Sequence, residues 1–303
     1  MTAISPTATD RATAAERDTS RFTALRALLR NKLAVLALAL LVLLLAAALF
    51  APLVAPHDPN AQNLLARLKP PAWADGGSRT NLLGTDQLGR DMLSRVLYGT
   101  RVSLLVGAGA ALLAGVIGTV VGLASGYFGG WADRALMRLA DVQLAFPAIL
   151  LALTIVGFLG SGLWYVILVL GFTGWVSYAR VVRSEVMSLR SRDFITEARA
   201  IGVTDVTIMR RHLLPNVMAP LATIGTLHVA AAIVAEASLS YLGLGVPKET
   251  VTWGGMLADG QLYLGTSWWV AVFPGIALML TSLAVNITGD ALRDVADPKA
   301  YRR

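Results

Sequence analysis

The chain has 303 residues, of which 55% are hydrophobic and only 15% are charged, and its mean hydropathy is +0.62. A soluble domain has about a quarter charged residues, so this composition favours a protein embedded in membrane lipid. The net charge of +7 does not imply a nucleic-acid partner here, because cytoplasmic loops of membrane proteins are enriched in Lys and Arg. The chain contains no cysteine, which excludes disulfides and thiolate chemistry, and its three histidines are too scattered to predict a metal site.

The N-terminal part predicts a tail followed by a membrane anchor. The first twenty residues of the tail expected over 1–32 are small, polar and charged, which is typical of disorder. The apolar run after Lys32 is too long for the core of a signal peptide. We therefore expect a retained first transmembrane helix over 33–56.

Five further segments are long and apolar enough to cross a bilayer, which takes roughly 20 residues of helix. They are 102–126, 140–160, 163–182, 218–242 and 268–289. The predicted fold is an all-α polytopic membrane protein with six transmembrane helices. The first helix is expected at the periphery, and residues 102–290 are expected to form a five-helix core.

The distribution of basic residues predicts the orientation. The N-terminal tail holds six Lys and Arg and residues 180–212 hold seven, whereas residues 243–267 hold only one. Basic loops stay in the cytoplasm, so both termini, including a C-terminal tail over 291–303, are expected to be cytoplasmic. Residues 57–101 carry six basic residues and four Asp; we interpret them as a folded external segment.

Residues 83–95, LGTDQLGRDMLSR, come within two residues of a G-x-x-x-x-G-K-[S/T] phosphate-binding loop. Gly84 and Gly89 have the required spacing, but Arg90 replaces the Lys and Asp91 replaces the hydroxyl residue that meets magnesium. No strand is predicted before this stretch, and the topology places it outside the cell. The chain is therefore not expected to bind or hydrolyse ATP itself.

Two patterns concern the interior of the bundle. Small residues recur every four positions in the span 102–126, which permits close helix packing in lipid and favours packing roles for Gly118, Gly122 and Gly126. A glycine-lined conduit wall is the alternative.

Glu236 is the most informative intramembrane charge, and His228 lies about two turns before it on roughly the same face. Such groups usually face a bundle interior or a water-filled cavity. Polarity and depth add Ser240 and Asn286 to the candidate substrate pathway. A buried structural pair or a Glu at headgroup level is equally compatible with the pattern.

Residues 183–215 are too polar to span a membrane and too patterned for a simple turn. The segment divides at Gly202, a natural helix stop, and restarts at Thr204 or Asp205, which are good N-caps. We predict two short helices, joined at the glycine, that form a cytoplasmic docking surface.

The same segment resembles the EAA motif of ABC importer permeases, E-A-A-x-x-x-G-(x)9-I-x-L-P. Gly202, Leu214 and Pro215 stand at the motif positions, whereas Thr196 replaces the Glu and Glu197 the first Ala. The stretches LGTDQLGRDMLSRVLYGTRVSLLVG, AEASLSYLGLGVP, TWGGML and GDALRDVADPK resemble the dipeptide/oligopeptide/nickel permease family, in the second of its two paired types.

This resemblance implies a type I importer fold and a machine with several partners. A second homologous permease would complete the membrane path, two ATP-binding subunits would hold ATP and magnesium, and an extracytoplasmic protein would deliver di- or oligopeptides. The chain itself would bind no cofactor and catalyse no reaction in the bacterial cytoplasmic membrane. The residues implied in coupling to the ATPases are Phe194, Thr196, Glu197, Ala198, Gly202, Asp205, Leu214 and Pro215.

Two other readings remain open from the residues. The same machine could import nickel, a nickel chelate, glutathione or another small solute, because the binding protein does most of the selecting. A stand-alone channel or secondary carrier would be favoured by inverted repeats or several paired intramembrane charges, neither of which is seen in the sequence.

Overall fold

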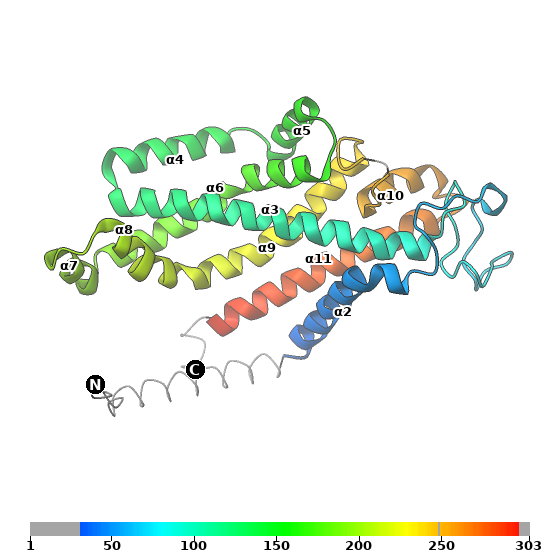
Figure 1. Cartoon of the computed structure of the whole chain (residues 1–303), viewed down its shortest axis with the longest axis horizontal. Helices are drawn as coiled ribbons and strands as arrows, with labels where there is room; N and C mark the ends of the chain where they lie inside the picture. Colours follow the sequence, from blue (N-terminus) through cyan, green and yellow to red (C-terminus); the bar gives the residue numbers. More distant parts are fainter. Residues whose placement is uncertain (1–30, 248, 297–303) are drawn as a thin grey trace, which may run out of the picture.

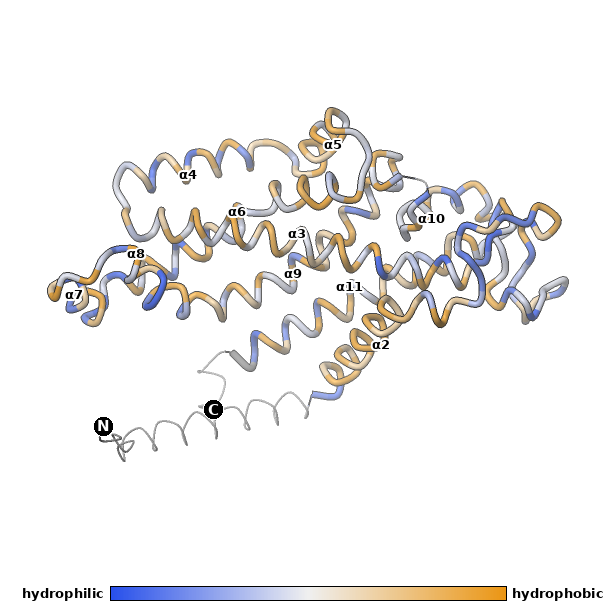
Figure 2. The backbone as a smooth tube through the Cα atoms, viewed as in Figure 1, coloured by the Kyte–Doolittle hydropathy of each residue, from blue (hydrophilic) through white to orange (hydrophobic). Residues whose placement is uncertain are grey.

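The computed structural model describes residues 31–247 and 249–296, and within them the chain is a bundle of long helices with no β-strand. Figure 1 shows the bundle with α7 and α8 at one end, and α10 with the segment that links α2 to α3 at the other. Figure 2 shows α2 apolar along nearly its whole length, whereas hydrophilic residues gather towards both ends of the bundle. This pattern suits a protein that crosses a lipid layer.

The first described helix, α2 (Lys32–Val54), lies at the edge of the bundle against α3 and α11. Asn31 caps it by accepting hydrogen bonds from the backbone amides of Leu33 and Ala34. Its buried residues are all alanines, and most of its large side chains are exposed. The helix thus presents a smooth face to the bundle and a leucine-rich face outwards. Of the tail predicted over 1–32, only Asn31 and Lys32 lie within the described chain.

The helix α3 (Met92–Phe128) begins ten residues before the expected span 102–126. Asp91 ends the preceding loop and caps this helix, accepting a hydrogen bond from the backbone amide of Ser94 at 2.8 Å. A helix of 37 residues is about 55 Å long, well beyond the ~30 Å apolar layer of a bilayer. The last ten residues of the segment expected over 57–101 are therefore the first part of a helix, and residues 57–91 precede it.

The prediction of a single continuous helix over 140–160 is wrong. The chain instead forms α4 (Gly130–Leu144) and α5 (Ala148–Leu159), which are bent by 87° at their junction. Pro147 lies in the break, where it lacks an amide donor and disfavours helical geometry at the residue before it. The described chain thus has five helices suited to crossing a membrane, or six if this bent pair counts as one span.

The remaining helices agree with the expected spans in order and extend several of them. They are α6 (Leu163–Arg190), α7 (Asp193–Ala200), α8 (Asp205–Ile208), a π-helical turn (Met209–Leu213), α9 (Leu214–Tyr241), α10 (Trp253–Gly260), a 3₁₀ turn (Gln261–Tyr263) and α11 (Trp269–Ala296). The most extensive packing joins α3 to α6, and α9 packs against both α3 and α11. Because α11 reaches residue 296, the first part of the tail expected over 291–303 is helical.

Candidate functional site

Gly202 joins α7 to α8 through a left-handed turn. Its φ is +82°, the amide of Gly202 donates to the carbonyl of Arg199, and the amide of Val203 donates to the carbonyl of Ala198. These two bonds make a Schellman motif, the common glycine-dependent end of a helix. The predicted helix stop at this glycine and the restart at Asp205 are confirmed. The second helix is not a separate short one, because α8, the π-helical turn and α9 run on as one helix over Asp205–Tyr241.

The segment 193–208, comprising α7 and α8, has one buried face and one exposed face. Ile195 and Ile208 are fully buried in an apolar cluster with the ends of α3 and α6. Ile201, next to Gly202, is instead 80% exposed, and Val206 is also exposed. A buried face fixes the segment on the bundle, and an exposed apolar edge leaves a surface that a partner could cover.

The residues implied in ATPase coupling divide between these two faces. Phe194, Thr196, Glu197 and Asp205 are exposed, whereas Ala198 is buried. Leu214, the first residue of α9, is half-buried beside the same apolar cluster, and Pro215 is exposed.

Tyr127, near the end of α3, was not singled out by the sequence. Its buried ring lies in the apolar cluster beneath the 193–208 segment, and its hydroxyl bonds to the carboxylate of Asp205. The guanidinium of Arg199 lies 4.7 Å from the centre of the ring, and Arg190 donates to the backbone carbonyl of Tyr127 at 3.0 Å. One residue of α3 therefore contacts α6, α7 and α8, and only the fold could reveal this.

Glu236, in α9, is 0% exposed. The hydroxyl of Ser240 donates to its carboxylate at 2.7 Å, and Ser103 of α3 approaches the other carboxylate oxygen at 3.5 Å. Thr252, which caps α10, also lies within hydrogen-bonding reach of the carboxylate. The polar cluster of Glu236 therefore links α3, α9 and the start of α10.

The other two candidate pathway residues lie apart from this cluster. His228 packs edge-on against Tyr178 of α6, with their ring centres 5.1 Å apart, and it fills the space left open by Gly174. Asn286 is half-buried in α11 and makes no side-chain hydrogen bond with the residues described. Of the four residues expected in a pathway, the structure joins only Glu236 and Ser240.

The predicted packing glycines lie where α3 meets α6. A Cβ added at Gly122 would be 2.6 Å from the carbonyl oxygen of Ala179, and one added at Gly126 would be 2.9 Å from that of Arg183. Gly118 is similarly close to the backbone of Trp175. The glycines thus allow the two backbones to approach, as the small-residue pattern indicated.

At the opposite end from α7, the segment 57–91 is folded by its own charges. The stretch that came close to a phosphate-binding loop is a tight turn in which Gly84 and Gly89 both have positive φ. Asp86 pairs with Arg90 at 2.6 Å, and Arg90 in turn reaches Asp259 of α10 at 3.4 Å. The charges of this stretch therefore pair with one another and with α10.

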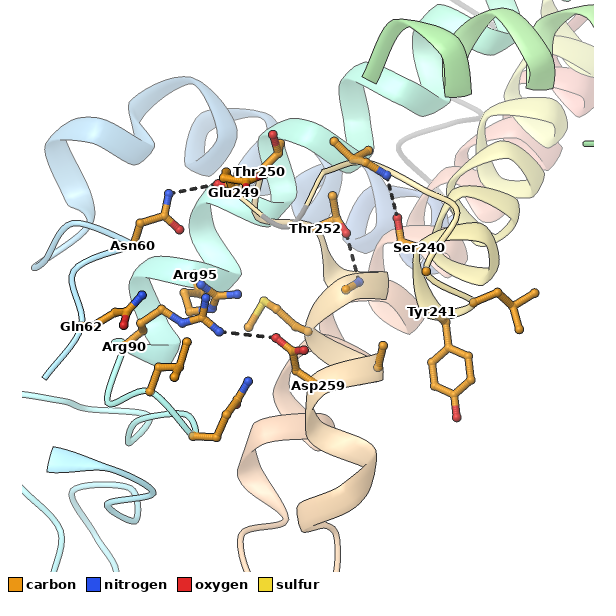
Figure 3. A pocket seen from close by; sticks show the side chains of 18 residues that line it. Asn60, Gln62, Arg90, Arg95, Ser240, Tyr241, Glu249, Thr250, Thr252 and Asp259 are labelled. Atoms are coloured by element: carbon orange, nitrogen blue, oxygen red, sulfur yellow. Dashed lines mark hydrogen bonds and ion pairs between the residues drawn. The ribbon is translucent and has the colours of Figure 1, made fainter. Parts of the chain in front are cut away.

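A cavity of about 760 Å³ lies beside this ion-pair network (Figure 3). Its walls come from the 57–91 segment, the start of α3, the end of α9 and α10. Figure 3 shows Arg90 directed towards Asp259 across the cavity, with Arg95 close by. Ser240 and Thr252 also line it, so the cavity borders the hydroxyl groups that contact Glu236.

The class of the chain follows from two family matches. Residues 118–302 match the family described as binding-protein-dependent transport system inner membrane component. Residues 22–71 match the N-terminal transmembrane domain of oligopeptide transport permease C. The chain belongs to the binding-protein-dependent permease family of ABC importers.

The permease has similar relatives along most of its length. It is 42% identical over 269 residues to the di/tripeptide transport system permease protein DppC of Pseudomonas aeruginosa, and this match covers 89% of each chain. It is 40% identical over 274 residues to the glutathione transport system permease protein GsiD of Pectobacterium atrosepticum, covering 90% of this chain and 89% of that one.

A solved structure matches the fold of the permease. The inward-facing methionine ABC transporter MetNI has a TM-score of 0.54 and 21% identity, and the match covers 67% of this chain and 97% of that chain. The all-α type I importer fold expected from the sequence is therefore confirmed. The described permease has long helices, with the folded 57–91 segment at one end and the apolar-edged 193–208 segment at the other.

Proposed function

We propose that this permease forms, with a second homologous permease, the transmembrane path of an ATP-driven peptide importer in a bacterial cytoplasmic membrane. Its similarity to the DppC protein of Pseudomonas aeruginosa favours di- and oligopeptides as cargo. An extracytoplasmic binding protein delivers the peptide, and two partner subunits bind and hydrolyse ATP. Both termini and the 193–208 segment face the cytoplasm, as the distribution of Lys and Arg indicates.

The observation that carries this proposal is the 193–208 segment at one end of the bundle. It is anchored on its buried side and exposes Ile201 and Val206 on the other. An exposed apolar edge beside charged residues fits the groove of a protein partner. Closure of the two ATPases would push on this edge, and the anchored face would transmit the movement to α3 and α6 as a rigid-body change.

The decisive experiment is purification of the tagged permease from gentle detergent extracts, followed by reconstitution of the complex in vesicles. We expect co-purification of a second permease and ATPase chains, with hydrolysis and uptake stimulated by the binding protein and a dipeptide. A permease that purifies alone, and transports without ATP, would overturn the proposal in favour of a channel or secondary carrier.

A matched pair of variants tests the docking surface. Ile201→Glu introduces a charge into the exposed edge and is expected to lose the ATPase chains. Leu262→Glu is the control, because Leu262 is similarly exposed, at 82%, but follows α10 at the opposite end. Equal loss in both variants would mean that charge on an exposed surface, rather than this edge, disrupts the complex.

Glutathione is the second candidate cargo, because the permease is nearly as similar to the GsiD protein of Pectobacterium atrosepticum. Competition distinguishes the two cargoes. Unlabelled glutathione should leave uptake of a labelled dipeptide unchanged if peptides are the cargo. It should displace the dipeptide if glutathione is preferred.

A further inference from the structure

The cavity beside α10 contains more buried positive charge than buried negative charge. Arg90 and Arg95 are both buried, and one buried carboxylate, that of Asp86, lies between them. This carboxylate is already engaged: it accepts hydrogen bonds from the backbone amides of Leu88 and Arg90 and from the Arg90 side chain. The two guanidinium groups thus share one buried carboxylate, and Arg95 also donates to the backbone carbonyl of Pro59.

Asp259 is the second acid near these arginines, but it is a weak partner. Its carboxylate lies 3.4 Å from Arg90, and its side chain is 39% exposed. Charge-assisted hydrogen bonds of this type are normally about 2.7–2.9 Å long. The Arg90–Asp259 contact is therefore open to exchange, whereas the 2.6 Å contact between Arg90 and Asp86 is not.

A second observation also points to a missing partner in this cavity. Gln87 lines the cavity, and its side-chain carbonyl oxygen is buried without a hydrogen-bond partner among the described residues. Buried polar atoms are almost always paired with protein, water or ligand. The polar groups of Asn60 and Thr250 line the same space.

We propose that this cavity is a binding site for the terminal carboxylate of a peptide cargo, which takes the place of Asp259 on Arg90. The planar fork of an Arg matches a carboxylate in two parallel hydrogen bonds. The volume of about 760 Å³ lies within the range of small-molecule sites. Glu249, on the exposed rim, offers a carboxylate to the ammonium end of the same zwitterion.

The position of Asp259 gives this exchange a mechanical consequence. Asp259 lies on α10, and its contact with Arg90 is an ion pair that connects α10 to the 57–91 segment. A cargo carboxylate on Arg90 would break that connection. Binding would therefore loosen α10 from the 57–91 segment, while the fully buried Trp253, which donates to the carbonyl of Val96, holds α10 on α3. This inference rests on the proposed peptide cargo.

Cysteine protection tests the site without the binding protein. The chain has no cysteine, so Leu242→Cys introduces a single thiol on the cavity wall, at an exposed residue. The rate of maleimide labelling of this chain is measured in the purified complex at increasing concentrations of alanyl-alanine or its C-terminal amide. We expect half-protection by the free acid at a concentration ~10-fold lower than by the amide, because the amide lacks the charged acceptor.

Three further variants are made in the Leu242→Cys background. Arg90→Gln should abolish the difference between acid and amide, and Asp259→Asn should strengthen protection by the acid, because the competing carboxylate is removed. Arg79→Gln is the matched control, since Arg79 is an exposed arginine of the same 57–91 segment that does not line the cavity. It should leave both curves unchanged.

Equal protection by acid and amide, or no effect of Asp259→Asn, would overturn the site. If the dipeptide gives no protection and the binding protein, added in a separate arm without peptide, does, the site is also overturned, in favour of an acidic side chain of that protein as occupant. These failures are separable from failure of the proposed function. A complex that still assembles with ATPases and imports peptide retains its function even if the protection assay contradicts the site.

Discussion

Tyr127 of α3 and Asp205 of α8 are joined by a hydrogen bond between the phenolic hydroxyl and the carboxylate. Arg199 of α7 donates to the same hydroxyl at 3.3 Å and stacks over the ring. The two short helices on either side of Gly202 therefore meet at one residue of α3. A movement of the 193–208 segment reaches α3 through this contact as well as through apolar packing.

Replacement of Tyr127 by Phe removes the hydroxyl and keeps the ring. We expect ATPase chains to remain bound, while peptide uptake per ATP hydrolysed falls, because each lost hydrogen bond contributes about 1 kcal/mol to the position of the segment. Uptake and hydrolysis are measured in the same vesicles. Tyr165→Phe is the control, since Tyr165 is exposed at the start of α6. An unchanged ratio in Tyr127→Phe would show that apolar packing alone transmits the movement.

Gly202 tests the backbone of the same segment. A Cβ at this position would contact no atom within 4 Å, so any effect of a substitution arises from its φ of +82°. Gly202→Val should cost about 1–2 kcal/mol locally and displace the segment, with loss of ATPase docking in a permease that still inserts. Gly202→Asn should be milder, because Asn tolerates left-handed geometry.

The measurement for Gly202 is the amount of ATPase chain that co-purifies with each variant. Gly265→Val is the matched control, because a Cβ at Gly265 also has open space around it and its φ is not in the left-handed region. Retention of docking and uptake in Gly202→Val would refute the role assigned to the segment.

Local features of this fold could be predicted from sequence because short-range chemistry decides them. The glycine stop and the restart of the helix after it depend on residues within one turn of each other. The apolar spans can likewise be predicted from the length of each apolar run. Contacts such as Arg90 to Asp259, 169 residues apart, have no such signal, and neither does the meeting of Tyr127 with Asp205.

The bend at Pro147 shows why hydropathy alone did not predict the helices in this region. Pro147 can bend a helix, yet the apolar composition of residues 140–160 favours one continuous span. Proline geometry prevailed over hydropathy, and α5 turns by 87° away from α4. For the pathway residues, polarity and depth selected His228 and Asn286, but these criteria do not specify which helix face meets which neighbour.

Two glycines of α3 provide a matched test of helix packing. Gly122→Ala would place a methyl group 2.6 Å from the carbonyl oxygen of Ala179, whereas Gly115→Ala would place one at an ordinary 3.4 Å from the ring of Tyr178. We expect the unfolding temperature of the purified complex to fall for Gly122→Ala, because overpacking costs about 1–3 kcal/mol of stability. For Gly115→Ala we expect the unfolding temperature to remain unchanged. Equal behaviour of the two variants would mean that α3 and α6 separate easily.

Glu236 was equally compatible with a pathway residue and a structural one, and its complete burial favours the structural role. Glu236→Gln keeps an oxygen for the Ser240 hydroxyl and should retain both thermal stability and uptake. Glu236→Leu leaves the hydroxyl groups of Ser240 and Ser103 without this acceptor and should cost about 1–3 kcal/mol of stability. Ser238→Ala is the control, because its hydroxyl bonds only to its own helix. If Glu236→Gln retained full stability but lost uptake, the carboxylate charge would act on the cargo in another conformation, and the pathway assignment would hold instead.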